Sequence, residues 1–232
     1  MADEDDGPKY VFITENEETK TTSRGYSGKA VAMYPNGDTY DGEFMDGTRE
    51  GRGVYSYAST VEKYDGEWRQ NRKHGIGKMT YAKTGVYNGF WENGRRHGEG
   101  VFNYTSGDVY SGWWKFGEKE GTGCYTFANG MKLYGDWVNG QITKGKWIYP
   151  NGMYYVGEFD NNKPKGNGQW VFKNGNTLDG VYEQKPKEVD EDEEAPEEEE
   201  EEGAIKKPKF VLEWHSNSNI SEAAHKVNSV DQ

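Results

Sequence analysis

A glycine-lysine segment in the second half of the chain has the outline of a phosphate-binding loop. In Gly140-Gln-Ile-Thr-Lys-Gly145-Lys146 two glycines precede a lysine, as in loops that wrap a nucleotide phosphate. Such loops continue with Ser or Thr, whose hydroxyl binds magnesium, and then enter a helix. Here Trp147 follows, and no helical pattern comes after it. The sequence therefore predicts no nucleotide site, no other cofactor site and no small-molecule substrate.

Histidine and cysteine are the next side chains that could bind a metal or take part in catalysis. His74 and His97 each precede a glycine, and zinc would need further ligands converging on them, which the spacing does not supply. Cys124 is the single cysteine, so the chain has no internal disulfide, and it fits a reducing compartment. No Ser, His and carboxylate recur together as a catalytic triad would. We predict structural histidines, a packing role for Cys124, no metal site, no catalytic site and no enzymatic activity.

Two basic pairs stand at equal positions, immediately before a His-Gly step. They are Arg72-Lys73 and Arg95-Arg96. If the chain is a stacked array, equal positions form a line along one edge. The four residues then predict a basic strip, which favours either a solvated edge or a binding surface for acidic protein segments and anionic lipid headgroups.

These residues belong to a repeat of the form Tyr-x-Gly-x-Trp/Phe. Its central glycines follow one another at intervals of 22 to 24 residues from Gly42 to Gly180, and two weaker copies begin with Leu133 and Leu178. So regular a period is typical of a stacked array. The residues expected to pack and assemble the repeats are Tyr40, Gly42, Phe44, Tyr64, Gly66, Trp68, Tyr87, Gly89, Trp91, Tyr110, Gly112, Trp114, Gly135, Trp137, Tyr155, Gly157 and Phe159.

Each repeat predicts one β-hairpin. Tyr87, Gly89 and Trp91 alternate along the chain and therefore face one side of a strand. The glycine between two aromatics predicts a gap in which a ring from the neighbouring hairpin lies against backbone. Asn-Gly steps at six turn positions supply tight turns between the strands. In a single-layer sheet, rings that do not pack between repeats should be left as an apolar partner surface.

Composition limits the kind of core and partner. Leu, Ile, Val and Phe supply only 33 residues, whereas Tyr, Trp and Phe supply 34, so the core must be thin and aromatic. Twelve acids and no base lie in Glu188 to Glu202, within a net charge of −12. Such acidity disfavours nucleic acid as a partner. The chain has no apolar run of about 18 residues and an acidic start, which predict a cytoplasmic protein without a membrane span.

The repeat resembles the MORN family (membrane occupation and recognition nexus), whose unit reads Tyr-x-Gly-x-Trp-x-x-Gly-x-x-His-Gly-x-Gly. Two copies match it best, Trp91-x-x-Gly94-x-x-His97-Gly98-x-Gly100 and Trp68 followed by His74-Gly75-x-Gly77. The resemblance implies an all-β fold, a single-layer twisted antiparallel sheet of tandem hairpins. We divide the chain into an acidic N-terminal segment (1–24), an array of six or seven repeats (25–184), an acidic disordered linker (185–203) and a C-terminal segment (204–232).

The C-terminal segment contains an alternating apolar pattern. Phe210, Leu212 and Trp214 would share one face of a strand. The pattern indicates either a strand that docks on a partner's sheet edge or an unstructured tail. Ahead of the array, Tyr10-Val-Phe-Ile13 predicts an irregular leading strand.

The order of acidic start, repeats containing Pro35-Asn-Gly-Asp-Thr-Tyr40, and glutamate-rich tail is similar to the MORN-repeat proteins of the radial spoke head. That resemblance implies a scaffold in the axoneme of cilia and flagella, part of the cytoskeleton. Its partners would be other spoke-head proteins, among them a MORN paralogue or a second copy of the chain. The alternatives are a phospholipid-associated MORN adaptor, supported by the basic strip, and another cytoskeletal MORN scaffold.

Overall fold

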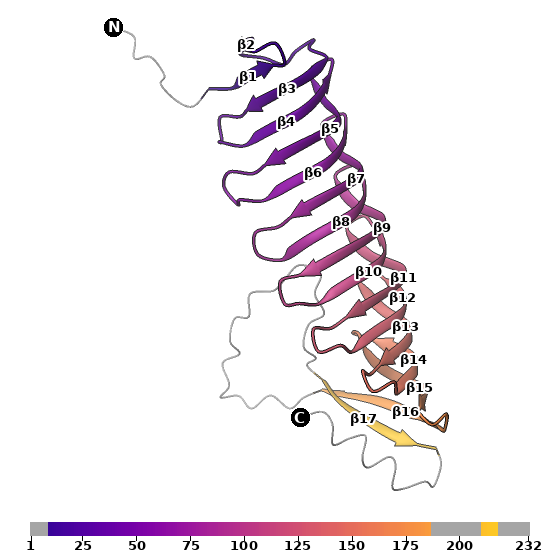
Figure 1. Ribbon diagram of the computed structural model, residues 1–232. Coiled ribbons are helices and arrows are strands. Elements are labelled where there is room, and N and C mark those ends of the chain that lie inside the picture. The colour runs from indigo at the N-terminus through magenta and orange to yellow at the C-terminus, as the bar shows by residue number, and fades with distance from the viewer. Residues whose placement is uncertain (1–8, 187–209, 218–232) are drawn as a thin grey trace, which may run out of the picture. The chain divides into compact units, whose positions relative to one another are not determined.

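The computed structural model describes residues 9–186 and 210–217, and every regular element in these ranges is a β-strand (Figure 1). The strands belong to one open antiparallel sheet of tandem hairpins, which confirms the predicted all-β, single-layer class. Within the described ranges there is no helix with the length and apolar character needed to cross a membrane. The strands are β1 (Val11–Thr14), β2 (Thr19–Lys20), β3 (Gly28–Met33), β4 (Thr39–Met45), β5 (Thr48–Ser56), β6 (Lys63–Arg69), β7 (Arg72–Thr80), β8 (Gly85–Glu92), β9 (Arg95–Tyr104), β10 (Val109–Lys115), β11 (Glu118–Thr126), β12 (Lys132–Val138), β13 (Gln141–Ile148), β14 (Tyr154–Asp160), β15 (Lys163–Val171), β16 (Thr177–Pro186) and β17 (Phe210–Ser216).

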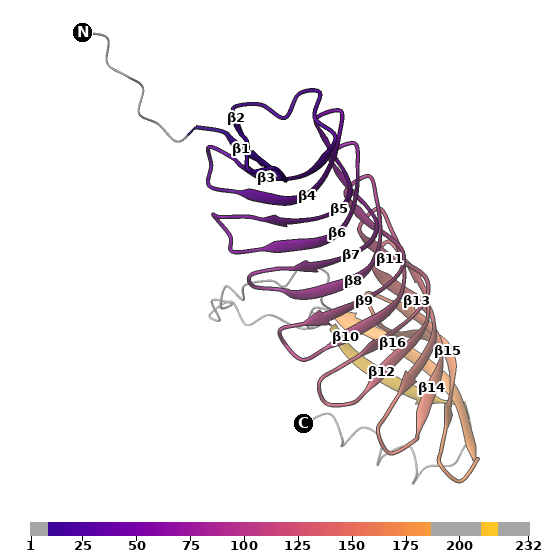
Figure 2. The ribbon, with the colours of Figure 1, turned by 45° about the horizontal axis from the view of Figure 1, so that its top comes forward.

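The chain divides into two compact units. One comprises Met1–Thr105 with Trp114–Gly117, and the other comprises Ser106–Trp113 with Glu118–Gln232. In the first unit β1 pairs with both β2 and β3, and from β3 to β9 each strand pairs with the next in chain order (Figure 2). In the second, β11 to β17 pair in the same way. The sheet thus begins at β1, which overlaps the leading strand predicted at Tyr10–Ile13.

The central glycines of the repeats face one another across the strands. In the first unit Gly53, Gly66, Gly77, Gly89 and Gly100 are consecutive cross-strand partners. A Cβ added to Gly66 would overlap the Cα of Gly77 and lie 2.7 Å from the hydroxyl of Tyr64. Glycine is therefore required along this row because two backbones and a ring meet there.

In the repeats that begin with tyrosine, the ring over the glycine pair comes from the same strand, which corrects the expectation that the neighbouring hairpin supplies it. Tyr64 is completely buried against Gly66 and Gly77, and its hydroxyl donates a hydrogen bond to the carbonyl of Glu67 at 2.9 Å. The neighbouring hairpin is reached instead by Trp68. This ring meets Tyr64 edge-on at 5.2 Å between centroids, and its Nε1 donates to the carbonyl of Gly53 at 3.0 Å. Trp91, Trp114 and Trp137 make the equivalent bond, so each motif tryptophan ties its own repeat to the previous one.

Each hairpin bends near its tip. In β6 and β7 the register shifts between Gly66 and Glu67, and Gly75 adopts φ +55°, a conformation that side chains disfavour. Beyond the bend Trp68 is opposite Lys73, and the two-residue turn of Gln70 and Asn71 closes the hairpin. The bend brings the start of β7 over the ring side of the sheet, which explains how a single layer buries its aromatic face.

Candidate interaction surfaces

The aromatic residues of the motif lie in the interior of the array. Tyr40, Tyr64, Tyr87, Tyr110 and Tyr155 are 0% exposed, and the motif tryptophans and phenylalanines are at most 6% exposed. These rings pack between repeats and the bent hairpins cover them, so the expected apolar partner surface does not include them. The large apolar side chains on the surface are others, namely Met33, Met45, Val61, Ile76, Phe90, Trp113, Phe116, Tyr134, Val138 and Val211.

Cations at one fixed position of the repeat complete this interior. Lys73 lies 4.7 Å above the ring of Trp91 and 5.5 Å from that of Tyr64, so its ammonium group faces π-electrons from two consecutive repeats. Burial lowers the pKa of Lys73. Equivalent contacts join Arg49 to Trp68 at 4.5 Å, Arg96 to Trp114 at 4.7 Å, and Lys119 to Trp137 at 5.0 Å. The cations therefore cross-link successive repeats from above the rings.

This placement corrects the predicted basic strip. Adjacent residues of a strand point to opposite faces, so the pairs are divided between inside and outside. Arg72 and Arg95 are exposed, whereas Lys73 is partly buried and Arg96 is 6% exposed. The Arg96 guanidinium also donates a hydrogen bond to the carbonyl of Gly117 at 2.8 Å. Two of the four residues are thus available to an anionic partner.

At the strand ends opposite the two-residue turns, aspartates form clamps, in which one carboxylate binds both a tyrosine hydroxyl and a backbone N–H of a later connection. These clamps were not predicted from the sequence. Asp38 accepts hydrogen bonds from the hydroxyl of Tyr55 at 2.7 Å and from the backbone N–H of Ala58 at 2.9 Å. Although burial alone raises the pKa of Asp38, these bonds lower it below its usual value. Asp108 makes the same pair of contacts with Tyr125 and Ala128 in the second unit. The Gly-Asp-x-Tyr spacing shared by residues 37–40 and 107–110 was the available signal.

The glycine-lysine segment, the two histidines and the cysteine first considered as chemical sites make contacts typical of strands and turns. Gly140 to Lys146 runs through the turn between β12 and β13 and along β13, not around a loop that opens a helix. His97 lies 3.3 Å from the carboxylate of Glu92. The carbonyl of His74 accepts a hydrogen bond from Tyr64, and Cys124 is half-buried with its sulfur 3.8 Å from the hydroxyl of Thr126.

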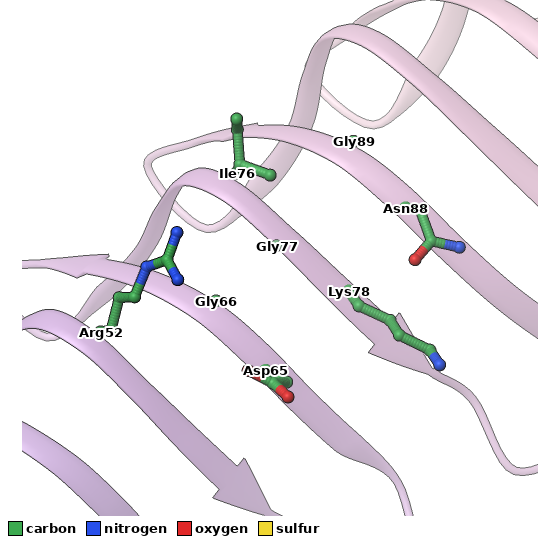
Figure 3. A pocket seen from close by; sticks show the side chains of 8 residues that line it. All are labelled: Arg52, Asp65, Gly66, Ile76, Gly77, Lys78, Asn88 and Gly89. Carbon is green, nitrogen blue, oxygen red and sulfur yellow. The ribbon is translucent and has the colours of Figure 1, made fainter.

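The outer face of the first unit carries a shallow groove (Figure 3). Its floor is the backbone of Gly66, Gly77 and Gly89, and its volume is about 290 Å³. Its walls carry charges of both signs and one exposed apolar side chain, from Arg52, Asp65, Ile76, Lys78 and Asn88. The groove lies between two rows of outward-facing side chains, one with Asp65, Lys78 and Asn88 and the other with Arg52 and Ile76, because the residues between the rows face the inner side of the sheet.

The C-terminal end of the second unit contains the predicted alternating segment. Phe210–Ser216 forms β17 and pairs with β16 of the same chain. Trp214 is 8% exposed and packs on Tyr182 at 4.9 Å and Tyr155 at 6.1 Å between ring centroids. Burial raises the pKa of Tyr155 to about 12. Leu212 is half-buried. Docking of this segment on a partner's sheet remains a prediction. The acidic run Glu188–Glu202 lies outside the described residues.

One group of side chains in the described ranges has potential metal ligands close together. Oxygen and nitrogen atoms of Glu183, Glu213 and His215 lie within 4.8 Å of one another on the surface of β16 and β17. Lys185 already supplies a cation there, since its Nζ is 2.6 Å from the Glu213 carboxylate. That contact raises the pKa of Lys185 and lowers the pKa of Glu213.

Five segments of the chain match the profile of the MORN repeat, at residues 40–60, 64–86, 87–109, 110–132 and 155–177. The matched residues do not include the weaker copies that begin with Leu133 and Leu178. No curated protein matches the sequence.

Solved structures with some likeness include two domains from Drosophila melanogaster. The SAS-4 (dCPAP) TCP domain, in complex with a proline-rich motif of Ana2 (dSTIL), shares 19% identity over 66% of this chain and 83% of its own, with a TM-score of 0.44. The TCP10c domain of Sas-4 shares 18% identity over 65% of this chain and 90% of its own, with a TM-score of 0.39. Likeness at this level carries no argument about function.

Proposed function

We propose that this chain, which contains five MORN repeats, is a non-enzymatic scaffold subunit of the radial spoke head in motile cilia and flagella. The scaffold part of the proposal rests on one observation, that the residues of the repeat motif are engaged in packing contacts within the array. Its motif rings, glycines and stacking cations pack within each repeat and between successive repeats, as Trp68, Gly66 and Lys73 illustrate. Such a chain gives a stiff surface for neighbours.

The spoke-head part rests on the arrangement of the sequence. Acidic residues at positions 3–6, repeats that include Pro35–Tyr40, and the glutamate-rich run Glu188–Glu202 resemble the order found in MORN-repeat spoke-head proteins. In that setting the chain would assemble with other spoke-head proteins and support signalling between the central apparatus and the dynein arms. The role is mechanical, because the array holds its partners at fixed positions and does no chemistry.

The test is the position of a tagged copy in a flagellated cell before and after detergent extraction. We expect the tag to remain at regular intervals along demembranated axonemes. Retention without that regular spacing would favour another cytoskeletal scaffold, and loss with the detergent-soluble membranes would refute the spoke assignment.

The membrane-adaptor alternative rests on Arg72 and Arg95, the exposed members of the basic strip. Replacing both with Glu should abolish binding to vesicles that contain anionic lipid if this alternative holds. Exchanging the exposed Lys78 and Lys83 for Glu is the matched control for total charge. On the scaffold proposal, neither double variant changes vesicle sedimentation or axonemal retention.

A further inference from the structure

The last repeat takes its second strand from a distant part of the chain. β16 carries the motif Leu178-Asp-Gly180-Val-Tyr182, and its antiparallel partner is β17. Other hairpins join their strands with two residues, as Gln70 and Asn71 join β6 to β7. Here Pro186 and Phe210 are opposite each other, and the 23 residues 187–209 connect them.

We propose that β17 is an exchangeable strand, and that in a pair of chains each copy docks its Phe210–Ser216 on β16 of the other. Opposed strand residues are only about 5 Å apart, a gap that two residues close. A connection of 23 residues extends to about 80 Å, enough to reach β16 of a second molecule. The inference is independent of the proposed spoke-head role.

The last repeat is incomplete without this strand. Leu178 occupies the position that tyrosine holds in the complete repeats, and it is too short to cover the central glycine. The Trp214 ring lies there instead: a Cβ added to Gly180 would be 2.8 Å from the Cε2 of Trp214. An extended segment with a large ring opposite Tyr182 fills this space and pairs with the edge of β16. Phe210–Ser216 can do so whether it comes from the same copy or from another.

β17 is also held less completely than strands inside the array. Trp68, Trp91 and Trp137 each donate their Nε1 hydrogen to a glycine carbonyl. On β17 the Nε1 hydrogen of Trp214 has no acceptor among the described residues, and Trp170 Nε1 and Tyr155 Oη on neighbouring strands also lack a partner there; other such atoms lie in the first unit, on Arg49, Thr84 and His97. Buried donors that lack acceptors weaken a contact, so this strand should detach more readily than its neighbours.

Charges on the outer face add to this weakness. Glu183 and Glu213 stand directly opposite each other, and like charges at opposed positions destabilise a strand pair. Lys185 bonds to Glu213, and His215 Nε2 lies 3.6 Å from the carboxylates of both Glu183 and Glu213, and these contacts offset part of the repulsion. A strand that is required by its repeat, loosely held and attached by a long connection satisfies the conditions for exchange between copies.

The test uses two full-length variants in a Cys124→Ser background. One carries Lys185→Cys and the other Val211→Cys, exposed positions that face each other across the strand pair. A short bismaleimide is added to the mixture, so only strands from different copies can give a mixed covalent dimer. A chain with both cysteines reports pairing within one copy, and Thr143→Cys replaces Val211→Cys as an exposed collision control.

We expect mixed dimers whose fraction rises with protein concentration, exceeds the collision control several-fold and falls when the second variant also carries Trp214→Ser. Cross-linking of the double-cysteine chain alone, with the mixture at the collision level, would overturn the exchange. Failure of the double-cysteine chain to cross-link internally, together with an unreactive mixture, would also overturn it, because β17 would then not pair with β16.

Discussion

Gly77→Ala should be among the most damaging single-methyl changes in the array. Gly77 has no positive φ, so alanine suits its backbone, and the cost comes from the space above it. The new Cβ would overlap the Tyr64 hydroxyl and lie 2.5 Å from its Cζ and 2.6 Å from its Cε2. These ring atoms belong to a residue that is 0% exposed and cannot turn aside without leaving the core.

The expected magnitude follows from the loss of that ring. Displacing Tyr64 is comparable to truncating a buried aromatic, which costs about 3–5 kcal/mol of unfolding free energy. It also breaks the hydrogen bond from Tyr64 to Glu67, worth about 1 kcal/mol. The matched control is Gly94→Ala, where φ is +85° and nothing lies within 4 Å of an added Cβ. Backbone strain alone should cost about 1–2 kcal/mol there.

A double-mutant cycle separates the clash from other effects. Once Tyr64→Ala removes the ring, Gly77→Ala should add little further destabilisation. The sum of the two single-variant losses of unfolding free energy should therefore exceed the loss in the double variant by about 3 kcal/mol. Urea unfolding of the full chain, followed by tryptophan fluorescence and by circular dichroism, gives each free energy, and coincidence of the two probes checks that a single transition is measured. Additive costs, or a Gly77→Ala cost equal to that of Gly94→Ala, would refute the reasoning.

Three further changes test other contacts by the same unfolding measurement. Val61 is β-branched, 85% exposed and at φ +59°, so Val61→Gly should stabilise the chain by about 0.5–1 kcal/mol; a loss of stability would contradict the inferred strain. Lys73→Met keeps the stem over Trp91 and should cost under about 1 kcal/mol, because relieved desolvation offsets the lost cation–π contact, whereas Lys73→Ala should cost about 2 kcal/mol. Equal costs would show that the charge dominates. Asp38 has a lowered pKa in the fold, so its contribution is present above about pH 4 and lost as pH falls through the folded value. The stability gap between wild type and Asp38→Asn should therefore shrink in melts from pH 5 to pH 2, while the exposed Asp41→Asn should show little gap at either end; a gap independent of pH would refute the clamp.

Side-chain alternation and turn residues, which act locally along the chain, were sufficient to predict most of the fold. Alternation places Tyr87, Gly89 and Trp91 on one face of a strand, and this needs no knowledge of the rest of the chain. Asn93-Gly94 supplies two positive φ values for a two-residue turn, and both appear there. Hairpins at a constant period then follow from nearest-neighbour geometry, which is why the all-β sheet could be predicted from the sequence.

The basic residues show where such reasoning stops. Strand alternation sends Arg95 and Arg96 to opposite faces, but whether the inward cation meets a ring depends on the bend near Gly98, at φ +59°. That bend puts Arg96 over Trp114 of the next repeat and leaves Arg95 outside. Contacts between repeats are tertiary, since they depend on how far one hairpin folds over the next.

The pairing of β17 is the clearest difference between the two levels. The alternation of Leu212 and Trp214 by itself determined that this segment suits a strand, because side-chain direction along an extended chain is local. Which edge it joins was decided only in the tertiary structure. The last repeat has Leu178 where complete repeats have tyrosine, and the Trp214 ring is the one that lies over Gly180. A strand's partner depends on which edge is left open and which space is left unfilled, and both become defined only when the whole array has formed.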